Sequence, residues 1–384
     1  MAFLKRHALL VLSACSFLFV INGCPADSTQ PVGHTHEQLF VLNENSKSLF
    51  VYDVPELHGP DTIPMPATFP HHLHFNPETE DYYIVSRDQG GTGRAYRLNA
   101  DTHEVFDSSG FEGLLTGVTT DPFGENLYIS DFGTDISQRT LMWKMNPATF
   151  TVEQEIQCGS QPHYIEVTED GETVVVVNAG SDEVTLYYPN GNPEDNVFNV
   201  KIDPDPDSAR PIGNPKFAPY GLVLAQDDSL AYLACKSSPE ADKAYILVFD
   251  LKQRQTIDTI KLDWTPRYSQ VGAAKYHLGL EILLEDDRYL AVTSQHGNSV
   301  YLIDLTDKSY VERAFSANWT FGITATSDER YIYVTASNGG TNPPQKGWVY
   351  ELERDGGNLT VLDSAQADML PNGCHVRHLF GHNH

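Results

Sequence analysis

The stretch Pro162-His163-Tyr164-Ile165-Glu166-Val167, followed by the acidic turn Glu169-Asp170-Gly171 and the strand-like segments 174–178 and 182–189, decides the fold. Each apolar segment is short, rich in β-branched and aromatic residues, and bounded by turn residues, which is typical of β-strands. The same unit, an inner strand followed by two more strands, recurs seven times after the N-terminal region. Further copies begin at His71, Thr116, Tyr220, Leu280 and Phe321. A strand unit repeated about every 45 residues predicts an all-β, seven-bladed β-propeller.

The first copy lacks an inner strand of its own. It begins at residues 39–43 and continues at 49–54, whereas a matching inner-strand segment, 373–379, occurs at the other end of the chain. A C-terminal strand that completes the first blade closes the ring and removes the exposed edges of an open sheet. We therefore expect one propeller domain over residues 38–384, closed by the C-terminal strand and without a convincing amphipathic helix.

The N-terminus predicts export. Lys5 and Arg6 precede an almost wholly apolar run at 8–21, which is typical of a secretory signal rather than a transmembrane helix. The run ends at Ile21-Asn22-Gly23-Cys24, which resembles a bacterial lipoprotein cleavage box. We expect a lipoprotein-type signal peptide at 1–23, lipidation at Cys24 and a linker at 24–37. A second candidate box ends at Cys15, and a plain secretory signal is the simpler alternative. The mature chain is then periplasmic or a lipoprotein of the outer membrane or cell surface.

The chain is strongly acidic. It has 25 lysines and arginines against 52 aspartates and glutamates, and its net charge is −27. Such a charge repels nucleic acid and anionic membrane surfaces. We therefore expect no nucleic-acid partner, and contact with a membrane only through the N-terminal lipid anchor.

Three cysteines remain after the signal, namely Cys158, Cys235 and Cys374. Their spacing matches no metal-binding pattern. Two arrangements are open: one disulfide with one free thiol, or three buried thiols.

Three strand segments carry a family resemblance, at residues 49–54, 298–304 and 331–335. They resemble the YVTN-type propeller family, which is similar to the N-terminal part of nitrous oxide reductase and to cytochrome d1-type propellers. The resemblance covers nearly the whole mature chain and implies a propeller. Members include binding proteins, scaffolds and a few enzymes, so fold analogy alone selects no function.

In a propeller, the start of each inner strand and the end of each second strand meet around the mouth of the central channel. Aligning the copies places at the inner-strand starts His71, Thr116, His163, Tyr220, Gly279, Phe321, and Cys374 or His375. We expect a protein or small-molecule ligand at this face, contacted by Arg87, Asp131, Tyr220, Lys236 and His296. The two cations, Arg87 and Lys236, could hold a carboxylate or could neutralise neighbours such as Asp88.

Histidines gather at the same mouth and at the chain ends. Imidazole is a common ligand of zinc and copper, the only cofactors that these patterns suggest. The candidate ligands of an axial site are His71, His163, His277 and His375. Ring closure brings the two ends together, and the candidates for a tetrahedral zinc there are His34, His36, His382 and His384. The alternatives are histidines that bond to channel backbone, and polar ends without a ligand.

The sequence favours an exported, lipid-anchored, monomeric propeller that acts as a ligand- or protein-binding module without turnover. One alternative is a periplasmic protein that binds zinc or copper through the channel-mouth or terminal histidines. Another is a lactonase- or lyase-like enzyme in which histidines and acids at the mouth do acid-base work, with Glu166 or Glu281 as the base. The sequence contains no Gly-x-Ser-x-Gly elbow, phosphate loop or Cys-x-x-Cys-His haem attachment.

Overall fold

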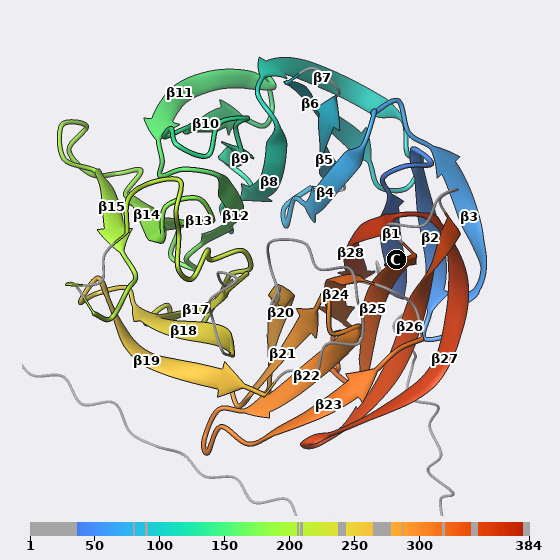
Figure 1. Ribbon diagram of the computed structural model, residues 1–384. Coiled ribbons are helices and arrows are strands. Elements are labelled where there is room, and N and C mark those ends of the chain that lie inside the picture. The colour runs from blue at the N-terminus through green and yellow to red at the C-terminus, as the bar shows by residue number, and fades with distance from the viewer. Residues whose placement is uncertain are drawn as a thin grey trace, which may run out of the picture. The chain divides into compact units, whose positions relative to one another are not determined.

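The computed structural model describes residues 37–79, 81–88, 91–205, 207, 210–236, 243–263, 278–285, 287–316, 319–338 and 345–378. Within these ranges the regular structure consists of β-strands in seven four-stranded antiparallel sheets. The sheets stand as blades around a central axis, and the innermost strand is the first of the blade in chain order except in blade 1, where it is the C-terminal strand (Figure 1). The predicted seven-bladed propeller is confirmed. No helix in the described ranges is long and apolar enough to cross a membrane.

The first four blades contain the following strands. Blade 1 has β28 (Pro371–His378), β1 (Glu37–Asn43), β2 (Ser48–Val54) and β3 (His58–Pro64). Blade 2 has β4 (Pro70–Phe75), β5 (Asp81–Asp88), β6 (Thr92–Asn99) and β7 (Val105–Glu112). Blade 3 has β8 (Leu115–Thr120), β9 (Leu127–Asp131), β10 (Leu141–Asn146) and β11 (Thr151–Gln157). Blade 4 has β12 (Pro162–Val167), β13 (Val174–Asn178), β14 (Glu183–Tyr187) and β15 (Val197–Lys201).

The remaining three blades complete the ring. Blade 5 has β16 (Val223–Leu224), β17 (Leu230–Ala234), β18 (Ala244–Asp250) and β19 (Gln255–Leu262). Blade 6 has β20 (Leu278–Leu284), β21 (Tyr289–Ser294), β22 (Ser299–Asp304) and β23 (Tyr310–Ala314). Blade 7 has β24 (Thr320–Ala325), β25 (Tyr331–Asn338), β26 (Gln345–Asp355) and β27 (Asn358–Met369).

Blade 1 is closed by the C-terminal strand, as the sequence predicts. β28 lies antiparallel to β1, with Val41 opposite Cys374 and Phe40 opposite His375. In Figure 1 the red C-terminal strand lies beside the blue N-terminal ones. This pairing covers the inner edge of β1 and gives blade 1 the same four strands as the other blades.

The hydrophobic core lies between neighbouring blades. β13 reads VVVVN, and all five of its residues are buried. Because successive side chains point to opposite faces of a sheet, Val175 and Val177 pack toward blade 5, whereas Val174 and Val176 pack toward blade 3. The continuous apolar runs therefore belong to strands that are covered on both faces.

None of the three cysteines within the described ranges forms a disulfide. Cys158 and Cys235 are buried, and burial raises the pKa of Cys158 to about 12. Of the two arrangements left open by the sequence, the structure therefore agrees with the one without a disulfide, except that Cys374 is only partly buried.

A bulge at the start of the inner strands shapes the channel mouth. The register of β8 with β9 shifts between Leu115 and Val118, and the hydroxyl of Ser130 accepts the N–H of Gly117 at 2.9 Å. The same hydroxyl donates to the carbonyl oxygen of His163 on the next blade at 3.2 Å. A Cβ at Gly117 would lie 2.5 Å from that carbonyl oxygen, so a side chain there would push the blades apart. Blades 2, 4, 6 and 7 have register shifts at the corresponding place.

Acidic side chains tie neighbouring blades together at the opposite face. Each carboxylate accepts the backbone N–H of a turn in the preceding blade, which uses part of the acidic excess for structure. The donor and acceptor pairs are Glu169 N to Asp228 Oδ2 at 2.8 Å, Gln226 N to Asp287 Oδ2 at 2.7 Å, Glu285 N to Glu329 Oε2 at 2.6 Å, and Ser327 N to Glu37 Oε1 at 2.9 Å.

Candidate functional site

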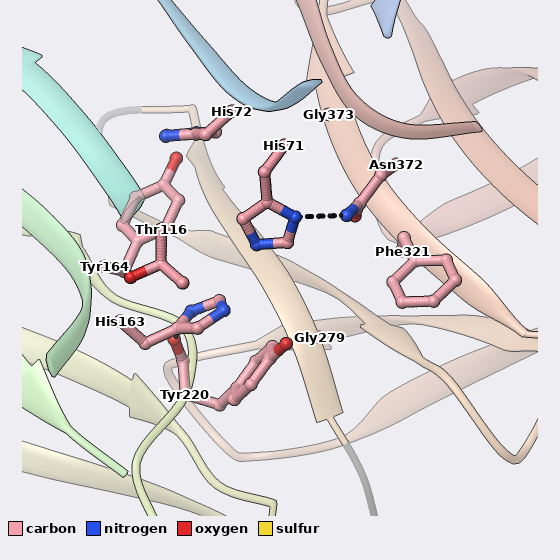
Figure 2. Close-up of a pocket in the computed structure, with 10 residues that line it drawn as sticks. All are labelled: His71, His72, Thr116, His163, Tyr164, Tyr220, Gly279, Phe321, Asn372 and Gly373. Carbon is pink, nitrogen blue, oxygen red and sulfur yellow. Dashed lines mark hydrogen bonds between the residues drawn. The ribbon is translucent and has the colours of Figure 1, made fainter. Parts of the chain in front are cut away.

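The inner strands begin around a narrow pocket, which we call the mouth pocket (Figure 2). Its volume is about 20 Å³, enough for a single water molecule. It is lined by His71, His72, Thr116, His163, Tyr164, Tyr220, Gly279, Phe321, Asn372 and Gly373. The sequence alignment therefore placed His71, Thr116, His163, Tyr220, Gly279 and Phe321 correctly at the mouth.

The same short sequence pattern positions four of these side chains. In four blades a residue with positive φ precedes a proline at the corner of the inner strand. These residues are Phe69 (φ 52°), Gln161 (φ 53°), Ala218 (φ 51°) and Leu370 (φ 56°). The residue after each proline faces the mouth pocket, and these four are His71, His163, Tyr220 and Asn372. The fixed φ of proline and the corner before it give the four side chains equivalent places around the axis.

Among the described residues, one ring nitrogen of His163 has a hydrogen-bond partner and the other has none. Its Nδ1 lies 3.0 Å from the carbonyl oxygen of Tyr220, so Nδ1 carries the proton and donates. The imidazole also stacks on the Tyr220 ring, with centroids 3.6 Å apart. Nε2 is buried and has no hydrogen-bond partner among the described residues. Burial first, and the nearby His71 and Arg87 next, hold the pKa of His163 well below its usual value. At neutral pH this ring is a neutral base with a free lone pair.

His71 is held by three neighbours from other segments. The Nδ2 group of Asn372 lies 2.7 Å from its Nδ1, as the dashed line in Figure 2 shows. Arg87 Nη2 contacts both ring nitrogens, at 2.7 Å from Nε2, and Glu44 Oε1 lies 3.4 Å from Nδ1. Burial, and then the charge of Arg87, lower the pKa of His71 well below its usual value. His71 is therefore also neutral, and its ring centroid is 5.8 Å from that of His163.

Arg87 supplies the positive charge of this cluster. Its Nη2 lies 3.4 Å from Glu44 Oε1, and its side chain keeps 28% of its surface exposed. Its Nε is buried and has no partner within the described ranges, so an N–H donor is left unused. Burial raises the pKa of Glu44, whereas the Arg87 charge and an Asn372 hydrogen bond oppose that rise.

Lys236 is a second cation at the mouth. Its Nζ lies 5.8 Å from the centre of the Tyr220 ring, a cation-π contact. Burial lowers the pKa of its ammonium group. The structure thus brings Arg87, Tyr220 and Lys236 to the same mouth, as predicted from the sequence.

Asp131 and His296 do not line the mouth pocket. Asp131 Oδ1 accepts the backbone N–H groups of Leu114 at 2.8 Å and Gly133 at 2.9 Å, so its carboxylate shapes a loop. The ring of His296 lies 6.1 Å from that of Trp319. The ligand contacts predicted for these two residues stay predictions.

The expected position of His375 at the mouth is wrong. β28 begins at Pro371, so Asn372 takes the mouth position and His375 lies about 10 Å further along the strand. There its ring centroid is 5.1 Å from Phe75 and 6.4 Å from His74. Of the three predicted axial ligands that lie within the described ranges, the mouth therefore brings together two, His71 and His163.

The remaining histidine predictions stay predictions. Within the described ranges, no group of three or more His, Cys, Asp and Glu side chains is placed to hold a metal ion. The predicted residues outside those ranges are Cys24, His34, His36, His277, His382 and His384. Of the two predicted acid-base residues, Glu166 lines a deeper cavity of the channel, and the side chain of Glu281 is not described.

Sequence reasoning missed Glu44 and Asn372. Asn372 could have been found from the phrase Pro371-Asn372, which matches Pro70-His71 and Pro162-His163. Glu44 lies in the turn after β1, and nothing in the sequence pairs it with Arg87 on the next blade.

Comparison with known proteins identifies the family. A family model described as "Lactonase, 7-bladed beta-propeller" matches residues 130–371, which is more than half of the 384-residue chain. A periplasmic gluconolactonase of Pseudomonas aeruginosa is similar in structure, with 16% identity, a TM-score of 0.66, and coverage of 88% of this chain and 98% of that chain. A protein of Bacteroides fragilis described as a candidate 6-phosphogluconolactonase has 16% identity, a TM-score of 0.65, and coverage of 90% and 99%.

The same fold also occurs in a protein of other chemistry. Hydrazine synthase of Kuenenia stuttgartiensis has 14% identity and a TM-score of 0.58, with coverage of 74% of this chain and 76% of that chain. At such identities, structural likeness shows the fold alone. No curated protein sequence matches the chain.

The family match corrects one prediction from the sequence. A binding module without turnover was the favoured function there, and the lactonase-like enzyme was an alternative. The match over residues 130–371 supports that alternative instead. The chain belongs to the lactonase family of seven-bladed β-propellers.

Proposed function

We propose that this protein is a lactonase that hydrolyses the cyclic ester of a small lactone at the mouth of the central channel. Membership of the family supports a reaction of this class. The observation that carries the proposal is a pair of unused polar atoms at one mouth: the acceptor His163 Nε2 and the donor Arg87 Nε are both buried, and neither has a partner among the described residues. Leaving such atoms unpaired is costly, and functional sites are where that cost is tolerated.

The two atoms match the needs of ester hydrolysis. A base must take a proton from water, and a donor must stabilise the negative oxygen that forms on the carbonyl. His163 is a neutral base because burial lowers its pKa, and the Tyr220 carbonyl fixes the proton on Nδ1. The mouth pocket has room for one water molecule beside this ring.

In the proposed reaction, water gives a proton to Nε2 of His163 while its oxygen bonds to the lactone carbonyl carbon. The carbonyl oxygen becomes an oxyanion, which the Nε–H of Arg87 stabilises. The ring C–O bond then breaks, and the proton on His163 passes to the leaving alkoxide oxygen. The product is an open-chain hydroxy acid whose carboxyl group releases a proton to solvent.

The neighbouring side chains position these groups. Glu44, 3.4 Å from Arg87 Nη2, orients the guanidinium and leaves its Nε side unused. Asn372 holds His71, which in turn contacts Arg87. Lys236 adds a cation that suits a hydroxyl or carboxylate substituent of the lactone.

The test measures hydrolysis of a panel of five- and six-membered lactones, glucono-δ-lactone included, with the purified protein in a pH-stat. His163→Gln should lower kcat by about 100-fold or more, which is the usual contribution of a positioned base. The matched control is His58→Gln, because His58 is exposed on the outer strand β3. Its kcat should equal that of the wild type.

Two results would contradict the proposal. One is a wild-type protein that hydrolyses no lactone of the panel. The other is lactone hydrolysis that His163→Gln leaves unchanged, provided that both variants show the wild-type unfolding transition.

We also propose that the reaction takes place outside the cytoplasm, on a protein anchored by a lipid at Cys24. The support is the sequence alone, with its signal at 1–23 and the box that ends at Cys24. Cys24→Ser should move the protein from the membrane fraction to the soluble fraction and abolish labelling by a radioactive fatty acid. Cys15→Ser is the control, and loss of labelling there instead would assign the anchor to the second box.

A further inference from the structure

The channel contains a second cavity, which we call the inner chamber. Its volume is about 460 Å³, and it extends from His72 and Tyr164 to the turn acids Asp287 and Glu329 at the opposite face. His72 and Tyr164 line both the inner chamber and the mouth pocket, and their rings lie 4.9 Å apart. These two rings form the partition between the cavities, which makes the inner chamber a compartment of its own.

The sequence shows that the partition is a special feature of two blades. The position after the mouth residue is glycine in four of the other five inner segments, namely Gly117, Gly221, Gly322 and Gly373, and leucine, Leu280, in the fifth. Only His72 and Tyr164 carry rings at this position. The inner chamber is therefore closed toward the mouth by side chains that the repeat itself does not require.

The charges that line the inner chamber are of one sign. Its described lining contains three carboxyl groups, Glu166, Asp287 and Glu329, and neither lysine nor arginine. Burial, together with neighbouring imidazoles, lowers the pKa of His72 and His74 to about 3, so both rings are neutral at physiological pH. A chamber of this kind attracts cations and repels anions.

Glu166 differs from the other two acids because no described residue forms a hydrogen bond or an ion pair with its carboxyl group. Asp287 accepts the N–H of Gln226 at 2.7 Å, and Glu329 accepts the N–H of Glu285 at 2.6 Å and lies 3.6 Å from Arg354. Among the described residues no hydrogen bond or ion pair reaches the Glu166 carboxyl group. It lines the chamber and is surrounded by protein, and burial raises its pKa to about 8.

We propose that the inner chamber binds a small organic cation of the primary-ammonium class, with the ammonium group on the carboxylate of Glu166. A primary ammonium group brings a positive charge and N–H donors to the Glu166 carboxylate, which has neither from the described residues. A metal ion is a poorer fit, because the described residues offer no group of three His, Cys, Asp and Glu ligands. The chamber volume is that of a small-ligand site, and its apolar strand residues, such as Ile282 and Leu283, suit an alkyl tail.

The test uses n-butylammonium chloride as the probe and isothermal titration of the full chain. The neutral comparison is n-butanol, which has the same tail without the charge. We expect saturable binding of one n-butylammonium, at least about tenfold tighter than that of n-butanol, because a charge-assisted hydrogen bond is lost with the alcohol. Equal binding of the two probes, or no saturable binding of n-butylammonium, would overturn the proposal.

The pH dependence identifies the residue. The other titratable groups that line the inner chamber are His72, His74, Tyr164, Asp287, Glu329, Cys374 and His375. Because Glu166 is mostly protonated at pH 7, the ammonium must displace its proton, so binding should be about tenfold weaker at pH 7 than at pH 9. The probe stays charged at pH 9, since an alkylamine resembles lysine with a pKa of about 10.4. Close to one proton should be released per bound probe at pH 7, and almost none at pH 9.

Glu166→Gln keeps the shape of the side chain and removes its charge. It should weaken n-butylammonium binding at pH 9 by about tenfold or more and remove the difference between pH 7 and pH 9. The control is Glu172→Gln, an exposed acid in the turn of the same blade. Unchanged binding by Glu166→Gln would refute the assignment. Should that variant fail to fold, proton release by the wild type decides, and its absence at pH 7 has the same meaning.

Discussion

Ser130→Ala tests how the blades hold the site. Ser130 is fully buried, and its hydroxyl accepts the N–H of Gly117 at 2.9 Å and donates to the carbonyl oxygen of His163 at 3.2 Å. Alanine leaves both backbone groups buried without this partner. Each such loss costs about 1 to 3 kcal/mol, so the free energy of unfolding should fall by about 2 to 6 kcal/mol. That is a large part of a total stability of about 5 to 15 kcal/mol.

The assay is equilibrium unfolding in urea, followed by tryptophan fluorescence. Ser130→Ala should lower the midpoint, while the slope m, which reports the surface exposed on unfolding, stays the same. Ser108→Ala is the control, because Ser108 is exposed on β7 and has only a 3.4 Å contact with Arg94. Its effect should stay within about 0.5 kcal/mol.

Blade 7 contains an equivalent hydroxyl bridge, so the same test can be made there. Thr335 accepts the N–H of Gly322 at 2.8 Å and donates to the carbonyl oxygen of Asn372 at 2.8 Å. Thr335→Val keeps the volume and removes the hydroxyl, so it should destabilise the protein as Ser130→Ala does. If both variants lose less than about 1 kcal/mol, the hydroxyl bridges do not hold the inner strands as argued.

Three further predictions concern the mouth and the thiols. Arg87→Gln should lower kcat for lactone hydrolysis by about 100-fold, as removal of an oxyanion donor does, whereas Arg94→Gln on β6 should leave kcat unchanged. Because the pKa of His163 is lowered, the base stays neutral as the pH falls, so kcat/KM should remain flat through about pH 6.5 and decline only at lower pH; a midpoint at about 6.5 would refute the burial argument. Since burial raises the pKa of Cys158 to about 12, iodoacetamide should label Cys158 in the unfolded protein and leave it unlabelled in the folded protein at pH 8, as mass spectrometry of the peptides would show.

Blade architecture could be predicted from the sequence because it depends on local patterns. The runs that form β13 and its neighbours are apolar because blades cover both faces, and acidic turns separate them. The closing strand could be predicted because the first unit lacked a part that the C-terminus supplied. His71, His163 and Tyr220 could be placed because each follows a proline at the same point of the repeat.

Contacts between blades could not be predicted in the same way. Glu44 and Arg87 lie on different blades, and the repeat fixes the position of each only within its own sheet. The closing strand was aligned on His375, although Pro371 was the equivalent corner, so Asn372 was missed. An alignment by residue type favoured histidine, whereas the backbone geometry depends on the proline.

The protonation state of the site depends on burial, which composition does not report. A net charge of −27 favours the protonated form of an exposed imidazole, and a protonated ring cannot act as a base. At the mouth the effect is reversed, because His163 is 5% exposed and lies near the positive charge of Arg87. The acidic surface and a neutral base are therefore compatible only because the inner strands exclude solvent from the ring. The neutral form of His163, which the proposed proton transfer requires, therefore depends on the fold and cannot be inferred from the composition.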